Sequence, residues 1–577
     1  MEVDCDEVAA RRLSRELGLE PLAARVLACR GFVEPAEAER FLASRLADLP
    51  DPFLMKGMDR AVARLVRAIQ ARERIALYGD YDVDGVTSTA LLAGFLRAAG
   101  AEVVTYVPHR LVEGYGLNTE AVRRLASEGA RLLVSLDCGI TSVAEVKAAA
   151  DLGVDAVVVD HHTAPVELPA AVAILNPHQP GCGYPYKPLA AVGVTFCLAM
   201  ALRRRLREVG HFGATRPEPN LREALDLVAL GTVADVVALT GVNRILVRWG
   251  LEELARTRRP GLRALKRVAG LQEGAAVTAG QVGFRLGPRV NAAGRLDDAS
   301  RGVRLLLETA EPAAAALADE LDRENRARQE IEREILVQAT AMAEERVLSG
   351  ARGLVLGQEG WHPGVIGIVA SRLVERFHRP TVLVGLAHGV GKGSGRSIEG
   401  FHLYDALAHC APHLARFGGH RHAAGLTLEP SALPGFRQAF EDYARERLDD
   451  DDLVPRCRIE GRFEPGQISE RAAQAVAQLG PFGAGYPEPI FALRGRPERA
   501  RTVGSGGIHL KLAFGRGLDA IGFSLGEKLG LCSGEVEAAV ALGFSEWEGA
   551  RRLELKIRDL RVPSENAVER PDMRDLP

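Results

Sequence analysis

The sequence predicts an α/β protein: a parallel-sheet domain, a long helix, a second and smaller α/β domain, and a C-terminal β-barrel. Strand-like apolar runs alternate with helical stretches over 75–175, which is typical of a parallel sheet. A charged, alanine-rich stretch covers 312–347, and short runs of alternating apolar and polar residues fill 456–562. The 577 residues are enough for three or four domains.

The first half of the chain holds short helices followed by the predicted parallel sheet. Residues 1–50 read as short helices and end at the breaker-rich Leu49-Pro50-Asp51-Pro52, and a helix is expected over 58–71. Further helices are expected at 88–99 and 143–152. The expected strands are 75–79, 103–107, 132–136, 156–159 and 173–175, in a domain covering 51–258.

The second half begins with a connecting region at 259–350 that contains the long helix. Its Ala, Glu and Arg content suggests a solvated connector between domains. A second α/β domain is expected at 351–448, and a small barrel of the oligonucleotide-binding (OB) type at 455–563. The polar tail, 564–577, is expected to lack fixed structure.

Composition excludes several classes of protein. The net charge of −3 means that any nucleic-acid site must be a local basic patch. The eight cysteines are scattered without a C-x-x-C pair, so neither a zinc ribbon nor a disulfide framework is expected. We expect a cytoplasmic protein with no membrane contact, because no apolar segment could span a bilayer and no signal-peptide run follows Met1.

Three carboxylates, Asp80, Asp82 and Asp84, stand where the first predicted strand turns into a helix. Two such charges about 4 Å apart repel by about 1 kcal/mol in water and by several times more in protein. A bound cation would relieve this cost, although aspartates also cap helices and favour turns. A calcium loop is rejected, because Leu91 stands where a bidentate Glu is needed.

Two more predicted strands end in the same chemistry. Asp137 follows 132–136, and Asp160-His161-His162 follows 156–159. The carboxyl ends of parallel strands meet at one edge of a sheet, so these groups should converge. Asp235 closes an apolar run and is either a helix cap or a further ligand.

Carboxylate oxygens with imidazoles suit Mg²⁺ or Mn²⁺. Shared carboxylates permit two ions roughly 3.5–4 Å apart, as in phosphoryl transfer. The residues therefore predict metal-dependent hydrolysis of phosphoesters.

The triplet Asp160-His161-His162 and the acidic motif before it resemble the DHH phosphoesterase family. The resemblance runs from about Val26 to Asp559 and is to the single-strand-specific exonucleases of that family. Segments 51–58, 287–296, 418–425 and 479–487 also carry it, with Tyr486 at a position where such sequences usually have Asn.

The resemblance implies a role for each residue of the predicted site. Asp82 and Asp84 would bind separate cations and Asp137 would bridge them. His161 and Asp235 would complete the second site, and Asp80 would bind or orient the first ion. Asp137, His161 and His162 would be catalytic, with His162 over the scissile phosphate. The implied activity is 5′-to-3′ degradation of single-stranded DNA to 5′-mononucleotides with two Mn²⁺ or Mg²⁺ ions, in DNA repair and recombination.

Phosphate binding is expected from two glycine-rich loops, 391–397 and 418–420, whose backbone N–H groups and cations suit an anion. For a single loop of this kind an ordinary turn is the commoner interpretation. Arg289, Asn291 and Arg295 suit backbone contacts or an interdomain ion pair about equally. With the resemblance, the predicted phosphate contacts are Arg110, Arg289, Asn291, Arg295, Ser394, Arg396, Gly419 and His420. In the barrel, the candidates for base stacking are Phe514, Phe523, Phe544 and Trp547.

Two other functions remain open at this point. A small-substrate phosphodiesterase of the same family, acting on oligonucleotides or cyclic dinucleotides, would not need the C-terminal barrel. An inactive replication scaffold would not need the intact carboxylates. The expected partners are single-stranded DNA, a single-strand-binding protein and a helicase, with the chain itself a monomer. A narrow passage between the two α/β domains would admit one strand and exclude a duplex.

Overall fold

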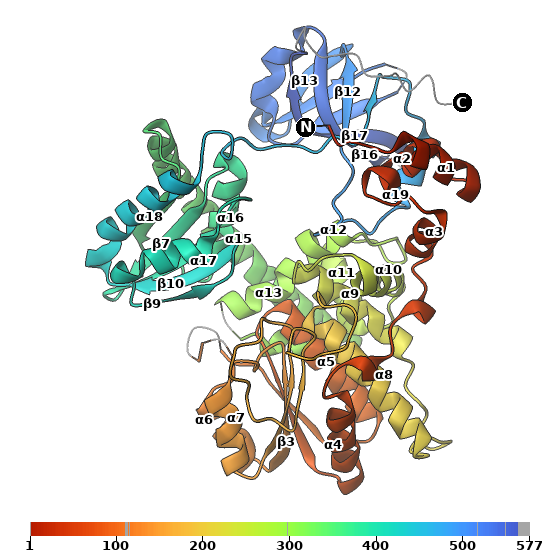
Figure 1. Cartoon of the computed structure of the whole chain (residues 1–577), viewed down its shortest axis with the longest axis vertical. Helices are drawn as coiled ribbons and strands as arrows, with labels where there is room; N and C mark the ends of the chain where they lie inside the picture. The colour runs from red at the N-terminus through yellow and green to blue at the C-terminus, as the bar shows by residue number, and fades with distance from the viewer. Residues whose placement is uncertain are drawn as a thin grey trace.

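Three β-sheets, each in a different part of the chain, organise the molecule (Figure 1). The computed structural model describes residues 2–109, 113–114, 116–296, 298–515, 517–547 and 550–563. The first sheet lies at one end of the molecule, and the second and third sheets lie towards the other, separated from each other in Figure 1. The predicted fold class, two α/β domains joined by a long helix and followed by a β-rich domain, is confirmed.

The N-terminal helices belong to the same hydrophobic core as the C-terminal sheet. They are α1 (Glu7–Leu17), α2 (Pro21–Cys29) and α3 (Pro35–Ala43). Leu13 and Leu27 pack in one cluster with Phe463 and Leu493, so the two ends of the chain fold together. Cys5 and Cys29 form a disulfide, which contradicts the expectation from the scattered cysteines. The pairing arises because the end of α2 comes back beside the N-terminal segment, which spacing alone does not reveal.

The first sheet is parallel throughout, with strand order β2-β1-β3-β4-β5. Its strands are β1 (Arg74–Gly79), β2 (Val103–Tyr106), β3 (Ala130–Leu136), β4 (Asp155–Val159) and β5 (Ala173–Leu175). The helices of this region are α4 (Met58–Ala71), α5 (Val83–Ala98), α6 (Thr119–Ser127), α7 (Val143–Asp151) and α8 (Ala191–Glu208). The chain leaves β1 for β2 on one side and returns to β3 on the other. The carboxyl ends of β1 and β3 therefore flank a switch point, where ligands collect in such sheets.

A helical layer follows the first sheet and leads into the long helix. It comprises α9 (Leu225–Ala234), α10 (Gly241–Ala255), α11 (Pro260–Val268), α12 (Ala279–Gln281), η4 (Val282–Leu286), α13 (Gly287–Leu296) and α14 (Ser300–Leu307). The long helix α15 (Glu311–Leu348) is not the solvated connector that its composition suggests. Leu317 and Leu321 are buried in the first domain's core, and Ile335 and Ala339 in the core of the second. Its small apolar residues let both domains pack closely on it.

The second α/β domain has the strand order β6-β7-β8-β10-β9. Its elements are β6 (Leu354–Glu359), α16 (Ile366–Phe377), β7 (Thr381–Ala387), β8 (Val390–Arg396), α17 (Leu403–His409), β9 (Arg416–Gly419), β10 (Ala423–Leu428) and α18 (Leu433–Arg447). The expected loop at 391–397 is mostly the strand β8, so that prediction is wrong. A Cβ at Gly391 or Gly393 would lie 2.7 Å from a leucine side chain of β10. These glycines make room for packing and form no anion-binding turn.

The C-terminal domain contains α19 (Glu470–Ala477) and a seven-stranded sheet of order β11-β12-β16-β17-β15-β14-β13. Its strands are β11 (Arg462–Phe463), β12 (Phe491–Gly495), β13 (Arg499–Val503), β14 (His509–Ala513), β15 (Asp519–Gly522), β16 (Val536–Trp547) and β17 (Ala550–Arg561). Phe514 is buried and Phe544 is partly buried in the core, whereas Phe523 is exposed. The side chain of Trp547 and the tail 564–577 lie outside the described residues. None of the helices in the described part of the chain is long and apolar enough to cross a membrane.

Candidate metal centre

The acidic motif forms the turn between β1 and α5. Asp82 is the N-cap of α5, and its Oδ1 accepts hydrogen bonds from the backbone N–H groups of Asp84 (2.9 Å) and Gly85 (3.1 Å). This cap starts the helix at Val83, five residues before the expected start. A Cβ at Gly85 would lie 2.5–2.7 Å from the backbone of Asp80, so the close approach of the two segments requires glycine here.

The side chain of Asp84 is hydrogen-bonded to the first backbone N–H groups of α8. Its Oδ2 accepts a hydrogen bond from Ala191 N (2.6 Å) and its Oδ1 accepts one from Val192 N (2.8 Å). The first N–H groups of a helix have no partner within the helix, and they favour a negative charge. The carboxylate is thereby held in one orientation although it is fully buried.

Asp160 lies at the end of β4 and organises the two histidines that follow it. Its Oδ1 accepts hydrogen bonds from the backbone N–H groups of His161 (2.7 Å) and His162 (3.1 Å) and lies 2.7 Å from His162 Nδ1. Its Oδ2 accepts a hydrogen bond from Ile140 N (3.0 Å). Both oxygens are therefore used within the protein, which is a positioning role that the sequence reading did not assign to Asp160.

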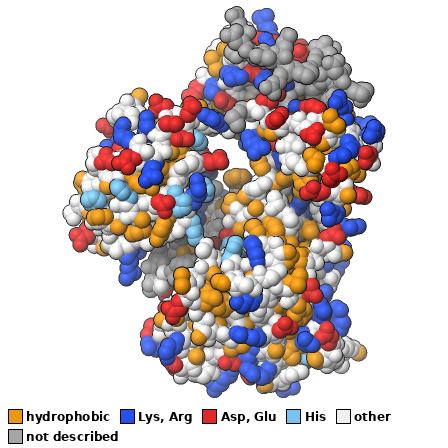
Figure 2. Space-filling model, in the orientation of Figure 1, with side chains coloured by type: hydrophobic (Ala, Val, Ile, Leu, Met, Phe, Trp, Pro, Cys, Tyr) orange, Lys and Arg blue, Asp and Glu red, His pale blue; other side chains and the backbone are white. Residues whose placement is uncertain are grey.

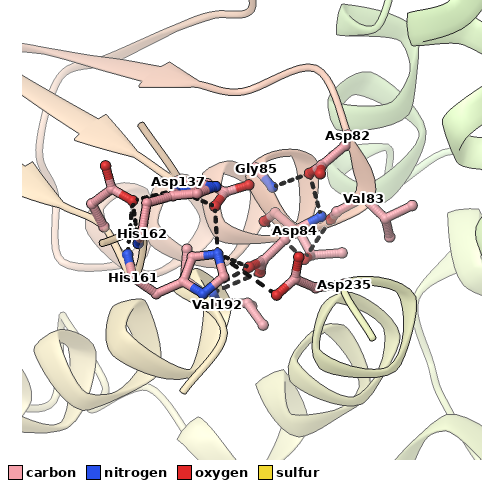
Figure 3. A network of polar contacts seen from close by, with 12 residues as sticks. Asp82, Val83, Asp84, Gly85, Asp137, His161, His162, Val192 and Asp235 are labelled. Atoms are coloured by element: carbon pink, nitrogen blue, oxygen red, sulfur yellow. Dashed lines mark hydrogen bonds and ion pairs between the residues drawn. The ribbon is translucent and has the colours of Figure 1, made fainter. Parts of the chain in front are cut away.

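The predicted metal ligands converge on one place (Figure 3). His161 Nε2 lies 3.3 Å from Asp137 Oδ1, 3.6 Å from Asp235 Oδ2 and 3.9 Å from Asp84 Oδ2. Three groups of side chains each have ligand atoms within 4.8 Å of one another: Asp137, His161 and His162; Asp84, His161 and Asp235; Asp80, Asp82 and Asp137. Asp137 and His161 each belong to two of these groups, and the resemblance implies that Asp137 is the ligand shared between two ions.

Buried atoms in this cluster lack hydrogen-bond donors. Asp137 Oδ1, His161 Nε2 and Asp235 Oδ2 are shielded from solvent, and no hydrogen bond satisfies them among the described residues. Burying a polar atom without a hydrogen-bond partner lowers the stability of the folded state, and the loss of free energy is largest for charged groups. Neighbouring ligands of an octahedral Mg²⁺ ion, each about 2.0–2.1 Å from it, are roughly 3 Å apart, close to the distances seen here. The side chains present fit Mn²⁺ or Mg²⁺.

The electrostatics agree with a site that binds cations. Burial, with the charge of Asp82, raises the pKa of Asp84 to about 7. Burial and the neighbouring carboxylates also raise the pKa of Asp137 and of Asp235 well above the usual range. Burial lowers the pKa of His161 to about 4, so this imidazole is neutral near pH 7 and able to bind metal. Asp137 also has φ +65°, a strained backbone conformation of a kind that clusters at functional sites.

His162 differs from His161 because of its contact with Asp160. Burial alone would lower the pKa of His162, but the hydrogen bond and charge of Asp160 raise it above its ordinary value. Burial likewise opposes ionisation of Asp160, yet its hydrogen bonds with His162 keep the pKa of Asp160 below its usual range. The contact directs Nδ1 towards Asp160 and the other ring nitrogen, Nε2, away from it.

We expect Asp160→Asn to lower kcat by roughly 10- to 100-fold, the usual effect of losing a group that orients metal-site residues. The amide has a single oxygen, and its NH2 group cannot accept the hydrogen bonds that the second carboxylate oxygen accepts, so the His161–His162 segment loses its fixed orientation. Steady-state cleavage of single-stranded DNA in Mn²⁺ measures the effect. Asp151→Asn, on the exposed surface of α7, is the matched control and should leave kcat unchanged. An unchanged kcat in Asp160→Asn would show that the orientation does not depend on this carboxylate.

The predicted phosphate contacts of α13 are engaged within the protein. Arg289 donates to Asp322 Oδ1 of α15 (2.9 Å) and to the backbone oxygens of Arg285 and Val268. Of the two interpretations left open for Arg289, the structure shows the ion pair between structural units, and the phosphate contact stays a prediction. Asn291 Oδ1 accepts a hydrogen bond from Val83 N (3.2 Å), which steadies the acidic turn.

Other predicted contacts lie at or near the second α/β domain. Arg295 Nη1 donates to Gly364 O (2.8 Å), which links the first domain to the second. Arg110 lies outside the described residues. Gly419 has φ +143°, and a Cβ there would lie 2.5 Å from Ala423 O, while the side chain of His420 is exposed.

Ser394 and Arg396 stand on β8 beside a small cavity. Arg396 Nη1 donates to Ser394 Oγ (3.2 Å), and Ser394 lines a cavity of about 380 Å³. Lys392, which belongs to the glycine-rich segment expected to bind phosphate, and Arg416, which was not predicted, also line it. Arg416 precedes the glycine pair 418–419 by two positions, and this cation beside glycines was the signal that could have found it.

Comparison with known proteins identifies the family. Residues 74–232 match the DHH family, N-terminal domain; residues 350–446 match the DHHA1 domain; residues 459–559 match the RecJ OB domain. The chain is 44% identical over 560 residues to the single-stranded-DNA-specific exonuclease RecJ of Dickeya dadantii, covering 94% of this chain and 96% of that protein. The chain belongs to the RecJ family.

Solved RecJ structures agree with this assignment. RecJ of Thermus thermophilus in complex with Mn²⁺ superposes with a TM-score of 0.83 at 35% identity, covering 98% of this chain and 79% of that one. The Mg²⁺ complex of the same protein gives a TM-score of 0.77 at 33% identity, covering 98% and 78%. The expected fold, cofactors and enzyme class, a metal-dependent exonuclease acting on single-stranded DNA, are those of the RecJ family and are confirmed. Family membership favours them over the small-substrate and scaffold alternatives.

Proposed function

We propose that this chain removes nucleotides one at a time from the 5′ end of single-stranded DNA, releasing 5′-mononucleotides. The observation that carries this is the convergence of the Asp80–Asp84 turn, Asp137, His161 and Asp235 around shared ligand atoms. Asp80, Asp82, Asp84, Asp137, His161 and Asp235 would hold two Mn²⁺ or Mg²⁺ ions, with Asp137 shared. When bound, such ions lower the pKa of water and neutralise charge on the phosphate.

The protein's own groups would orient the scissile phosphate. His162, whose pKa is raised through Asp160, holds a proton more readily than an ordinary histidine and can donate a hydrogen bond from Nε2 to a phosphate oxygen. The backbone N–H groups of α8 keep the Asp84 carboxylate fixed during this contact. Burial keeps His161 neutral, so it acts as a ligand and not as a proton donor.

The 5′ polarity is supported by the second α/β domain. The cavity beside Ser394 is lined by Lys392 and Arg416, and Arg295 joins this domain to α13, the helix whose Asn291 contacts the acidic turn. A terminal phosphate carries more charge than a backbone diester and would gain more from two cations. We propose that this cavity, with Arg396 and Arg110, receives the 5′-phosphate and so places the first diester at the metal centre.

The cellular setting is part of the same proposal. The chain would act as a monomer in the cytoplasm, in DNA repair and recombination. A helicase would supply the single strand, and a single-strand-binding protein would present it. Domain boundaries at 51–258, 259–350, 351–448 and 455–563 would separate the catalytic, connecting, phosphate-binding and strand-binding parts, after a helical segment at 1–50.

The polarity is tested with internally labelled strands blocked at one end by a bulky group. A 5′ block should abolish mononucleotide release and a 3′ block should not. Removing the 5′-phosphate should lower kcat/KM by roughly 10- to 100-fold, the value of a few hydrogen bonds to a charged group. Release that continues past a 5′ block, or faster cleavage of a dinucleotide than of a long strand, would contradict the proposal.

A further inference from the structure

An aromatic ring stands in solvent on the helix that runs beside the metal centre. Phe284 lies in η4 and is 80% exposed, although phenylalanine is usually buried. Its helical neighbours Val282 and Leu286 are buried. The segment is a π-helix between α12 and α13, and such interruptions of an α-helix occur frequently at functional sites.

The same helix packs on the metal centre. A Cβ at Gly287 would lie 3.3 Å from the Cβ of Ala234, the residue before Asp235. Four residues further on, Asn291 accepts the hydrogen bond from Val83 N beside Asp82. From Phe284 to Asn291 the helix rises roughly 10 Å at 1.5 Å per residue. Phe284 and Asn291, which contacts the acidic turn, therefore lie on consecutive helical segments, η4 and α13.

Phe284 lines a cavity of about 1260 Å³ between the core helices and the C-terminal domain. Figure 2 shows the molecule hollowed at its centre, where these parts and the second α/β domain face one another. The far wall of the cavity is formed by β16 and β17, including Phe544 and Lys556. The cavity thus connects the strand-binding domain with the helix that reaches the metal centre.

The cavity has more cations than carboxylates. The charged residues that line it are Arg248, Arg285, Lys556, Arg558, Glu252 and Glu488. Arg558 is paired with Glu488. Arg248 and Arg285 donate to the backbone oxygens of Leu42 and Gly270, and no ion pair involves them or Lys556 among the described residues. With Glu252 counted against these three cations, the lining keeps a surplus of two positive charges that would attract a polyanion.

We propose that Phe284 is a stacking platform for a nucleobase of the single strand as it passes from the C-terminal domain to the metal centre. Proteins that hold single strands without sequence preference combine cations for the phosphates with flat aromatic faces for the bases. Phe284 supplies the flat face, and Arg285 and Lys556 supply cations beside it. It is a positioning residue, because it holds the strand and touches no reacting atom. The inference rests on the proposed function, since it requires a strand that travels towards this metal centre.

The test compares variants of the full chain on long and short substrates. With metal removed by a chelator, Phe284→Ala should bind a strand of roughly 30 nucleotides about tenfold more weakly, within the 5- to 150-fold range expected for one stacked base. Phe284→Trp should bind like the wild type, and Phe284→Leu, apolar but not flat, should resemble Phe284→Ala. In Mn²⁺, hydrolysis of a dinucleotide should be the same in all four proteins.

A fluorescent base analogue gives a second readout. An analogue moved along the strand should be quenched at one position in the wild type and in Phe284→Trp, and not in Phe284→Ala. Equal affinity of Phe284→Ala and wild type for the long strand would overturn the inference, and is the result expected if the ring contacts another protein. A loss of dinucleotide hydrolysis by Phe284→Ala as large as its loss of strand binding would also overturn the inference, because it would place the effect of the substitution at the metal centre. Absence of any Mn²⁺-dependent cleavage by the wild type would instead refute the proposed function, and the binding comparison would still judge Phe284.

Discussion

Asp137→Ala is expected to abolish Mn²⁺-dependent cleavage while leaving binding of single-stranded DNA nearly unchanged. Asp137 belongs to two of the three groups of ligand atoms, so its loss disrupts both predicted ion sites. Losing several kcal/mol of charge stabilisation corresponds to a fall in kcat of roughly three orders of magnitude or more. Steady-state nuclease rates and fluorescence anisotropy with a labelled strand measure the two effects separately.

Asp151→Ala is the matched control for this experiment. Asp151 is an exposed aspartate on α7, paired only with Lys147 among the described residues, and its loss should alter neither rate nor affinity. Retention of a substantial kcat by Asp137→Ala would place the reaction elsewhere in the molecule. A parallel loss of strand binding would show that the carboxylate supports the fold or the DNA contact and not the metal alone.

Binding of Mn²⁺ is expected to raise the Tm, and to raise it more at pH 8 than at pH 5.5. The pKa values of Asp84, Asp137 and Asp235 are raised in the folded protein, so the metal-free folded state holds protons that the unfolded chain has already released. These three carboxyls add to the free energy of unfolding, and their contribution is fully present below pH about 4, the pKa of the carboxyls in the unfolded chain. The contribution is lost as the pH rises through their pKa values in the folded protein, about 7 for Asp84. His161, with its pKa lowered to about 4, acts in the opposite direction but is a single group.

Bound Mn²⁺ ions prevent this fall in the free energy of unfolding at high pH, because their positive charge balances the carboxylates in place of the protons. An ion concentration 100 times the Kd stabilises by about 2.7 kcal/mol, or roughly 5–10 °C for a domain of this size. Thermal unfolding followed by circular dichroism, with and without Mn²⁺ at each pH, gives the comparison. In Asp84→Asn the pH dependence of the metal-free Tm should be weaker. A Tm increase that is equal at both pH values would contradict the coupling between protons and metal.

The sequence predicted the strands and the metal ligands well where a local residue pattern is enough to determine the element it forms. The apolar runs that end at Asp80, Asp137 and Asp160 became strands of the parallel sheet, and the order β2-β1-β3 brings Asp80 and Asp137 to adjacent strand ends. The ligands could therefore be predicted from residues far apart in the chain. Asp235 could not be resolved between cap and ligand, because it occupies the C-cap of α9 and also lies 3.6 Å from His161.

The sequence was less informative where a partner comes from another part of the fold. It could not decide between a phosphate contact and an ion pair for Arg289, because Asp322, its partner on α15, is 33 residues away. The glycines of β8 read as a loop because the leucines that fill the space above them belong to β10. The role of Asp160 was missed because most of the groups that donate to it are backbone N–H groups, which no side-chain pattern reveals.

The long helix α15 has a consequence for how the enzyme discriminates among nucleic acids. Its 38 residues extend roughly 57 Å, and both α/β domains bury apolar side chains on the same uninterrupted rod. Swinging the domains apart would require unpacking one of those cores, so the width between them is set when the chain folds. This fixed spacing fits the expectation that the passage between the two domains admits one strand of DNA and excludes a duplex.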